Sequence, residues 1–264
     1  MRPVFAHRFA VQTQSETWIS AAYTKTGVEG TIVQTPRLSD RLSAIAGYIN
    51  NGASVADIGT DHGLLPVYLA HNGFARRIIA SDISADSLGA ARRTAAKYGA
   101  AGLIEFSVAS GLESINETDV DTIVLAGIGG ETIARILIGA PWTKNDKRLI
   151  LQPQSKSVEL CIWLRENGYT ILDSQLAFEN ERYYIIMLAE GGVSDSKLEP
   201  ELELMARLMY NNDPLFTSYL ESLIVRTQKA VDGMKGSGSP DTLNMALRLS
   251  VYLSLKEAHE KCRQ

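Results

Sequence analysis

Residues 55–66 read Val55-Ala-Asp-Ile-Gly-Thr-Asp-His-Gly-Leu-Leu-Pro66 and contain a short apolar run, a loop with two glycines, and a second apolar run. The first run has the length of a buried strand, and the second opens a helical pattern that continues to Asn72. A loop between a strand and a helix suits a nucleotide-like ligand, because glycines let the backbone approach closely and the helix N-terminus presents free N–H groups. The segment predicts a ligand site in a Rossmann-like sheet.

Short apolar runs alternate with helical patterns around this segment, as parallel βαβ units require. Strands are predicted at 55–58, 78–82, 104–108, 122–126 and 148–151, and helices at 38–50, 64–72, 85–98, 131–138 and 156–167. Two more strands, 169–176 and 182–189, are separated only by the polar segment 178–181, which predicts an antiparallel hairpin. A parallel sheet that ends in such a hairpin is typical of the class I methyltransferase fold, whereas a dinucleotide-binding domain continues with βα units.

The chain is predicted to have three parts. Residues 1–37 lack a sustained period and form an irregular N-terminal extension, and residues 38–192 form the methyltransferase-like α/β domain. Residues 193–264 form a helical, coiled-coil-like hairpin, with a leading helix at 199–210, two long helices, and a breaker at 236–240. This appendage can be a structural cap, a dimer surface or a platform for a large substrate, and its apolar stripes favour the cap. We expect a monomer or a weak homodimer.

The composition describes a soluble globular protein, with 45% hydrophobic and 21% charged residues in a chain of 264. The longest apolar run, 183–189, is too short to span a membrane. Cys161 and Cys262 form no metal-type or redox-type pair, so we expect the reducing cytoplasm. No cluster of His, Cys and acidic residues at metal-ligand spacing is evident in the sequence, so we expect no metal. The net charge of −4 argues against coating nucleic acid through the overall field, and leaves local basic clusters at 76–77, 92–97 and 144–148, each of which is more simply a solvated face.

The acidic residues in the first loop indicate the kind of cofactor. Only Gly59 and Gly63 are glycines, and Asp61 stands where a dinucleotide site requires bare backbone against pyrophosphate. A carboxylate repels a diphosphate but attracts a sulfonium and an α-ammonium group. Asp57 and Asp61 therefore favour S-adenosylmethionine over NAD. The alternative for Asp61 is a cap of the helix that begins near Gly63.

Later strand ends supply the rest of the predicted site. Asp82 follows Asp57 by 25 residues, close to the spacing at which an acid binds ribose hydroxyls, and Ile83 can pack on adenine; the alternative for Asp82 is an N-cap of the next helix. Small residues at the ends of the third and fourth strands leave room for a ligand across the carboxyl edge of the sheet. After the fifth strand, two glutamine amides are suited to hydrogen-bond the edge of a planar base. These positions are Ser110, Gly111, Ala126 and Gly127, followed by Gln152, Pro153 and Gln154.

Several motifs together resemble the TrmK family of bacterial tRNA (adenine-N1)-methyltransferases. They are Ser39-x-Arg41-Leu42, ADIGTDHGLLP at 56–66, ASDI at 80–83, Gly111-Leu112, AGIGG at 126–130, LILQPQ at 149–154, and Trp163-Leu164 before Gly168-Tyr169. The resemblance implies methyl transfer from S-adenosylmethionine to N1 of adenine 22 in tRNA, with the helical tail assisting tRNA binding. The chain departs from the family pattern by carrying Asp82, Ser110, Ile128, Gln154 and Ile185.

Residue roles follow from this reaction. The N1 lone pair needs no deprotonation, so positioning supplies most of the acceleration, and a carboxylate stabilises the cationic product. Asp61 is the predicted catalytic residue with His62 as a helper, although His62 can be an ordinary helix-start histidine. The target base must be unpaired or flipped outward. Predicted substrate-binding residues are Arg41, Gln152, Pro153, Gln154 and Tyr184. The alternatives are a methyltransferase for a small molecule or protein, and a non-catalytic RNA-binding module with a vestigial pocket.

Overall fold

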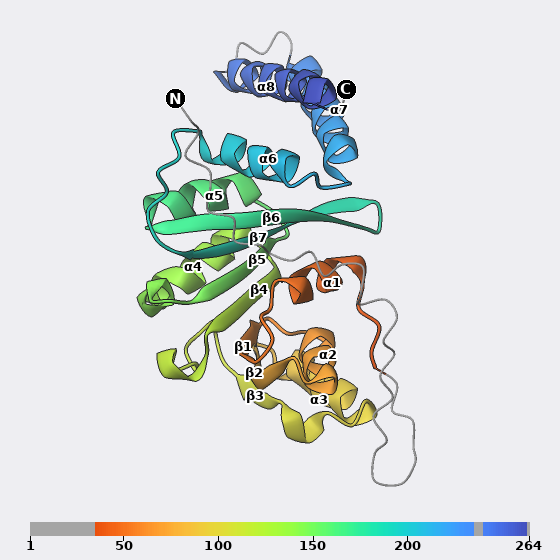
Figure 1. Ribbon diagram of the computed structural model, residues 1–264, viewed down its shortest axis with the longest axis vertical. Helices are drawn as coiled ribbons and strands as arrows, with labels where there is room; N and C mark the ends of the chain where they lie inside the picture. The colour runs from red at the N-terminus through yellow and green to blue at the C-terminus, as the bar shows by residue number, and fades with distance from the viewer. Residues whose placement is uncertain (1–34, 235–239, 263–264) are drawn as a thin grey trace. The chain divides into compact units, whose positions relative to one another are not determined.

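The structure is a computed structural model that describes residues 35–234 and 240–262 (Figure 1). The chain divides into two units, Met1–Thr35 and Pro36–Gln264, and every helix and strand given below belongs to the second unit. Almost all of the predicted N-terminal extension, 1–37, lies outside the described residues. So does most of the predicted breaker at 236–240.

A seven-stranded sheet forms the centre of the second unit, with the order β3-β2-β1-β4-β5-β7-β6. Its strands through β5 are parallel, β7 is antiparallel to β5, and β6 is antiparallel to β7. This order confirms the predicted class I methyltransferase architecture. The direction of winding reverses between β1 and β4, and ligands of open α/β sheets bind at such a reversal. The strands are β1 Ala53–Ile58, β2 Ala75–Asp82, β3 Glu105–Val108, β4 Thr122–Ile128, β5 Arg148–Pro153, β6 Tyr169–Glu179 and β7 Arg182–Gly191.

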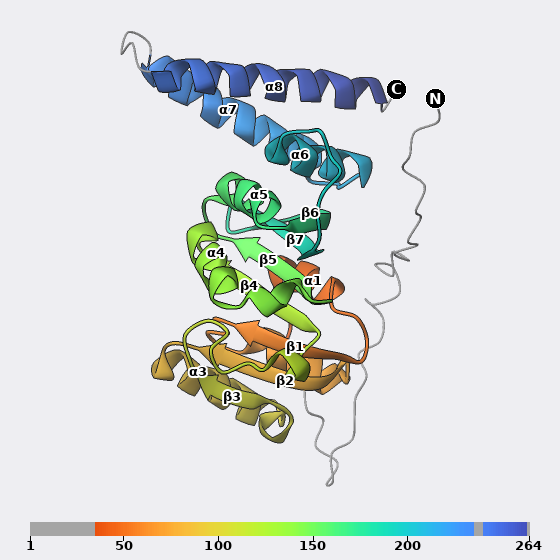
Figure 2. The ribbon, with the colours of Figure 1, turned by 90° about the vertical axis from the view of Figure 1, so that its left-hand side faces the viewer.

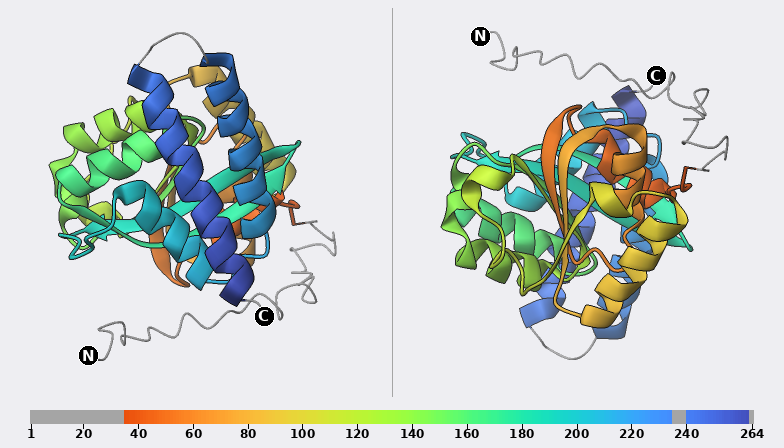
Figure 3. Two further views of the ribbon diagram at one scale, coloured as in Figure 1. Left: turned by 90° about the horizontal axis from the view of Figure 1, so that it is seen from above. Right: turned by 90° about the horizontal axis from the view of Figure 1, so that it is seen from below.

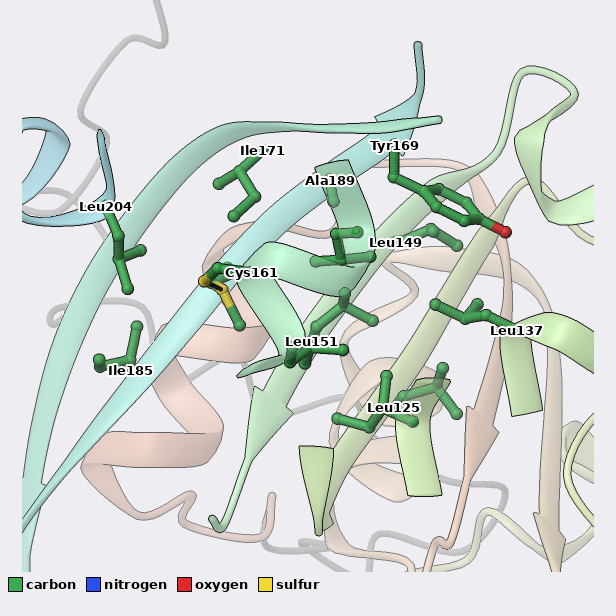
Figure 4. Packing of buried hydrophobic residues seen from close by; sticks show 14 of the residues in the cluster. Leu125, Leu137, Leu149, Leu151, Cys161, Tyr169, Ile171, Ile185, Ala189 and Leu204 are labelled. Atoms are coloured by element: carbon green, nitrogen blue, oxygen red, sulfur yellow. Dashed lines mark hydrogen bonds between the residues drawn. The ribbon is translucent and has the colours of Figure 1, made fainter. Parts of the chain in front are cut away.

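Helices cover both faces of the sheet and create two hydrophobic cores (Figures 1 and 2). Neighbouring strand residues such as Val55 and Ala56 belong to opposite cores, because side chains alternate along a strand. Helices α1 Asp40–Gly47, α2 Leu64–Asn72 and α3 Ala85–Lys97 contribute to one core, and α4 Gly130–Gly139 and α5 Ser157–Glu166 to the other. Figure 4 shows the second core, where Leu125, Leu149 and Leu151 pack with Cys161 and Tyr169. Short 3₁₀ helices span Ala101–Leu103, Glu117–Asp119 and Pro141–Lys144.

Helix α1 carries Arg41 in its first turn. The Ser39 side chain caps the helix by accepting a hydrogen bond from the Leu42 N–H, and Asp40 in the first turn complements the helix dipole. The helix ends at Gly47, earlier than the predicted end near Asn50. Its start near residue 38 was predicted correctly to within two residues.

The β6–β7 hairpin is longer than predicted. Asn180 and Glu181 have φ values of 50° and 58° and form a two-residue turn, so the strands continue up to Glu179 and from Arg182. Phe178 lies inside the strand rather than in a polar linker, because its ring packs on the Tyr183 ring opposite, with centroids 4.7 Å apart. The predicted linker at 178–181 was therefore too long by two residues.

The C-terminal helices are α6 Pro200–Tyr210, α7 Phe216–Met234 and α8 Pro240–Cys262. Helices α7 and α8 lie side by side as an antiparallel pair (Figures 2 and 3). Thr217 contacts His259 at 3.1 Å and Glu221 pairs with Lys256 at 2.9 Å, which fixes the register of the predicted helical hairpin. Buried residues of α6 and α7 join the same core as α4 and α5. None of the helices within 35–234 and 240–262 is long and apolar enough to cross a membrane.

Candidate active site

The loop after β1 is shaped by left-handed backbone at three positions. Gly59, Asp61 and Gly63 have φ values of 77°, 46° and 67°. The N–H groups of Gly59 and Thr60 both donate to the Ser81 carbonyl of β2, at 2.8 and 3.1 Å, which ties the loop to the neighbouring strand. A Cβ on Gly63 would lie 2.8 Å from the Cβ of Ala91, so glycine is needed where α3 passes closely.

Asp57 is a buried carboxylate beneath this loop. Its Oδ2 accepts a hydrogen bond from the Thr60 hydroxyl at 2.8 Å. Burial raises the pKa of Asp57 to about 6; the Thr60 hydrogen bond lowers the pKa, the charge of Asp82 raises it, and Arg41 lowers it. The charge of Asp57 therefore responds to changes near neutral pH and to any cation bound beside it.

Asp82 ends β2 and faces the same loop. Its two carboxylate oxygens accept the backbone N–H groups of Asp61 at 3.3 Å and Ser84 at 2.8 Å, which leaves lone pairs on both oxygens for a ligand. The neighbouring Ile83 side chain is 74% exposed, unusual for a large apolar residue. Asp82 does not cap α3, because Ser84 does so by accepting from the Ser87 N–H.

Asp61 and His62 lie at the exposed tip of the loop. Asp61 Oδ2 is 3.6 Å from His62 Nε2, and both side chains are largely open to solvent. Helix α2 begins after Gly63 without a side-chain cap, so the alternative role of Asp61 as a helix cap is contradicted. The Asp61 carboxylate is thus available for interactions outside the protein.

The loop after β3 and the last residues of β4 complete this half of the edge. The Ala109 N–H donates to the Asp82 carbonyl at 3.1 Å and places exposed Ser110 beside the end of β2. Gly111 has a φ of 55° and closely approaches Ile136, since a Cβ there would lie 3.0 Å from Ile136 Cγ1. At the carboxyl end of β4, partly buried Ala126 precedes exposed Gly127, which has a φ of 76°; the strand continues to Ile128, two residues beyond its predicted end. The predicted cofactor residues therefore gather at one edge of the sheet.

Gln152 holds the other half of the edge together. Its side chain is fully buried, and its Oε1 accepts hydrogen bonds from Arg41 Nη1 at 2.9 Å and from the Gly127 N–H at 3.1 Å. Its Nε2 donates to the Pro153 carbonyl at 2.9 Å. The expected contact between this amide and a substrate base is thus not accessible in this structure. Gln152 positions Arg41 instead, while Gln154, two residues on, is exposed.

Arg41 is held by residues from three strands. Besides the hydrogen bond to Gln152, its guanidinium carbon lies 5.6 Å from the centre of the Tyr184 ring, and its Nε is 3.9 Å from Glu179 Oε2. This carboxylate oxygen is buried and accepts no hydrogen bond within the part of the chain that the structure describes. We call these four residues, Arg41, Gln152, Glu179 and Tyr184, the Arg41 cluster. It brings together residues that are more than 100 positions apart in the sequence and that no local motif connects.

Sequence reasoning missed Glu179 because it was assigned to a polar linker. The signal that would have found it is the predicted hairpin itself. A hairpin that follows a parallel strand returns its turn to the carboxyl edge, so residues on both sides of that turn become site candidates.

The predicted basic cluster at 76–77 is paired within the protein. Arg77 contacts Glu105 and Asp119, each at 2.7 Å, and Arg76 donates to Ser54 at 2.7 Å and to Asp121 at 3.2 Å. These contacts support the solvated-face interpretation for 76–77. Among the described residues, no three His, Cys, Asp or Glu side chains gather as a metal site would require.

Comparisons with known proteins agree with this geometry. A family model described as "Methyltransferase domain" matches residues 38–187. The tRNA (adenine(22)-N(1))-methyltransferase of Bacillus subtilis (strain 168) is 38% identical over 161 residues, which cover 61% of this chain and 68% of that protein.

Solved structures show the same fold with nearly complete coverage of the relatives. Streptococcus pneumoniae Sp1610, assigned as a tRNA (m1A22) methyltransferase, has a TM-score of 0.76 at 26% identity over 83% of this chain and 100% of that chain. Its complex with S-adenosyl-L-methionine has a TM-score of 0.73. M. capricolum TrmK in complex with S-adenosyl-homocysteine has a TM-score of 0.71 at 28% identity, over 83% of this chain and 98% of that chain. With a family model matched over more than half of its length and 38% identity to a tRNA (adenine(22)-N(1))-methyltransferase, this chain belongs to the TrmK family of methyltransferases.

Proposed function

We propose that this protein transfers a methyl group from S-adenosylmethionine to N1 of an adenine in tRNA, in the cytoplasm. The observation that carries the proposal is the arrangement of one sheet edge, in which three carboxylates at the ends of β1 and β2 lie beside the Arg41 cluster. One half of the edge suits a cationic methyl donor, and the other suits a nucleic acid.

The acidic half fits S-adenosylmethionine. Asp82 keeps free lone pairs on oxygens that backbone N–H groups already orient, as binding of two ribose hydroxyls requires, and the exposed Ile83 offers an apolar face to adenine. Asp57 and Asp61 favour the positive sulfonium and ammonium groups, and Ser110, Gly111, Ala126 and Gly127 leave space along the edge. The donor supplies an activated methyl group on sulfur. A diphosphate cofactor fits poorly here, because three carboxylates would repel it.

The protein's own residues then hold the adenine and stabilise its new charge. Methylation at N1 makes the ring cationic, so a carboxylate nearby lowers the energy of the transition state. Asp61 is exposed and free to take this role, with His62 next to it. A guanidinium close to N1 would oppose the reaction. We therefore assign Arg41 to a phosphate or to an acceptor atom of the RNA, with Tyr184, Pro153 and Gln154 around it.

The nucleotide is proposed from the relatives, which act on adenine 22. Because N1 lies on the pairing edge, the base must leave its stack before it reaches the loop. The C-terminal helices extend the surface on the Arg41 side and support RNA binding. We also propose the division into an N-terminal extension at 1–37, a catalytic domain at 38–192 and a helical domain at 193–264, acting as a monomer or a weak homodimer.

The test is methyl incorporation by purified protein from labelled S-adenosylmethionine into an unmodified tRNA transcript. A matched transcript with guanine in place of adenine 22 is the control. Label in the first transcript and none in the second supports the proposal. Label in both transcripts overturns the choice of nucleotide, transfer only to small molecules or proteins overturns the choice of substrate, and donor binding without transfer to any substrate overturns catalysis.

Asp61 is tested in the same assay. We expect Asp61→Asn to lower kcat by about a hundredfold while leaving the melting temperature unchanged, since the side chain is exposed and caps nothing. His62→Ala is the matched neighbour and should cost less than about tenfold. Unchanged kcat in Asp61→Asn would remove Asp61 from the proposed mechanism.

A further inference from the structure

A cavity of about 380 Å³ lies between the loop after β5 and the C-terminal helices α6, α7 and α8. Its lining begins at Pro153 and Gln154, directly after the buried Gln152. Gln154 also borders the active edge, because its Nε2 would lie 4.0 Å from a Cβ placed on Gly127. The cavity is therefore next to the place where we propose that the target base binds. Figure 3 shows α7 and α8, the two blue helices, side by side.

The cavity is positively charged although the chain as a whole is negative. Lys156, Arg226 and Arg248 line it, against a single carboxylate, that of Glu201. Glu201 is already engaged by Arg248 at 3.1 Å and by the Tyr252 hydroxyl. A local excess of cations in an acidic protein is the electrostatic signature of an anion site.

Arg226 is the lining cation for which the described residues supply no ion-pair partner. It is exposed on α7 and forms no ion pair or hydrogen bond with any residue in the described part of the chain. Lys156 pairs with Glu159 alone among the residues that the structure describes, at 3.5 Å, where both side chains are half exposed and the pair is weak. Two of the three cations are therefore available to phosphate oxygens.

The cavity also offers aromatic and aliphatic surface. The partly exposed ring of Tyr183 lies 5.4 Å from the ring of Tyr219, at 57°, and Tyr219, Leu223 and Met205 line the cavity as its buried floor. Unstacked RNA bases bind to aromatic side chains in this way, while arginine and lysine hold the phosphates. A volume of about 380 Å³ lies at the lower end of the range for small-molecule sites and is enough for one nucleotide.

We infer that this cavity binds one unstacked nucleotide of the RNA substrate, a neighbour of the methylated adenine, with Arg226 and Lys156 on its phosphate and its base against Tyr183 and Tyr219. The inference rests on the proposed function, since it takes RNA as the substrate. A nucleotide held there fixes the strand on one side of the target base and so favours the flipped conformation. The C-terminal helices thereby become part of the substrate site.

The first test is charge reversal at Arg226 in the full-length protein. Arg226→Glu should raise the KM for tRNA about tenfold and leave kcat and the affinity for S-adenosylmethionine unchanged. Lys229→Glu is the matched control, because Lys229 is exposed on the same helix and does not line the cavity; its KM should change less than about twofold. Equal effects of the two variants would show that only the overall electrostatic field of the helix matters, and this result would overturn the inference. An unchanged KM in Arg226→Glu would overturn it as well.

A second variant tests the shape of the cavity without changing its charge. Ala230 lines the cavity, so Ala230→Phe should fill it and also raise the KM for tRNA. Salt dependence adds a separate readout: in Arg226→Ala the slope of log KM against log salt should become shallower by about 0.7, the amount expected for one lost contact to single-stranded phosphate. A salt slope equal to that of the wild type would count against a phosphate contact.

Direct binding separates this inference from the proposed function. Fluorescein-labelled hexauridylate, which contains no adenine to methylate, should bind the wild type about tenfold more tightly than Arg226→Glu in the absence of donor. If tRNA is not methylated but this difference in affinity persists, the proposed function is wrong and the assignment of the cavity as an RNA-binding site is supported. If tRNA is methylated and the difference is absent, the cavity is not an RNA site. Competition by free uridine monophosphate at equal affinity would make it a free-nucleotide site and overturn the RNA assignment.

Discussion

Two regions share the carboxyl edge of the sheet but carry opposite charge. The first consists of the loops after β1 and β2, and the second of the elements around β5, β6 and β7. Asp57, Asp61 and Asp82 give the first region three carboxylates and no cation of its own. The second region has Arg41 held over Tyr184 and, beyond Gln154, a cavity lined by cations. The difference teaches how one edge can serve two ligands of opposite charge, and it supports the proposal of a positively charged donor beside the first region and a negatively charged acceptor beside the second.

The largest effect is expected from a substitution that removes a carboxylate of the acidic region and leaves the cationic region intact. Asp82→Ala should weaken binding of S-adenosylmethionine by at least about a hundredfold, because it removes a charged acceptor of two hydroxyls and the partner of the Asp61 and Ser84 N–H groups. Calorimetry with the donor measures this loss. Asp86→Ala, on the exposed first turn of α3, should bind normally. RNA affinity should be unchanged in both, and a large loss of RNA affinity in Asp82→Ala would show that the two regions are not separate.

The second effect breaks the cationic region. Arg41→Ala should lower kcat/KM for tRNA about thirtyfold and change donor affinity less than twofold, because it removes the group that Gln152, Glu179 and Tyr184 position. Arg41→Lys should recover only part of this loss, since an ammonium cannot reproduce the planar contacts. Full activity in Arg41→Lys would mean that only charge matters at this position.

The third effect concerns pH and sharpens the comparison. In the proposed donor site Asp57 attracts the cationic donor only when it is ionised, and burial raises its pKa to about 6. Donor affinity should therefore fall about tenfold between pH 7 and pH 5, as the protonated form becomes dominant. Asp57→Asn should bind weakly at both pH values and show no such fall. A flat pH profile in the wild type would remove Asp57 from the donor site.

The contribution of Asp57 to folding stability should depend on pH in the opposite sense to donor affinity: it is more favourable at low pH. Because the folded pKa of Asp57 lies above its ordinary value of 3.8, the ionised form is less favourable in the folded protein. This cost is absent below pH 4 and complete above about pH 6. Asp57→Asn should thus raise the melting temperature at pH 8 more than at pH 4, as calorimetric scans would measure, and equal shifts at the two pH values would contradict it.

The smallest expected effect lies away from both regions. Arg77→Ala removes ion pairs with Glu105 and Asp119 at the surface, and exposed pairs contribute little. We expect the KM for tRNA to change less than about twofold. A larger rise would extend the RNA surface to the far side of β2.

Much of the fold follows from local patterns in the sequence. The helix Leu64–Asn72 was predicted with both ends correct, because Gly63 and Gly73 bound it, and each predicted strand lies within an observed strand or overlaps one. Strand ends were less accurate, since a residue such as Phe178 is placed by its partner across the hairpin.

The acidic half of the site was predictable for the same reason. Asp57, Asp61 and Asp82 come at the ends of adjacent strands, and strand order brings such ends together. The Arg41 cluster was not predictable as a unit, because Arg41 and Glu179 are far apart in the sequence and meet only through packing of α1 on the hairpin. Burial of Gln152 was also invisible, since its amide is satisfied by a distant side chain and a backbone N–H.

Because β7 runs antiparallel to β6, the two strands are joined by a short turn at the carboxyl edge of the sheet, and this turn can accept inserted residues. The turn at Asn180 and Glu181 lies beyond the last paired residues, Glu179 and Arg182, so added residues there would disturb no strand pairing. The same turn stands next to Glu179, and changes in its length would alter one wall of the proposed acceptor site without changing the loops after β1 and β2. Divergence of acceptor preference among relatives is thus expected to concentrate in this short connection.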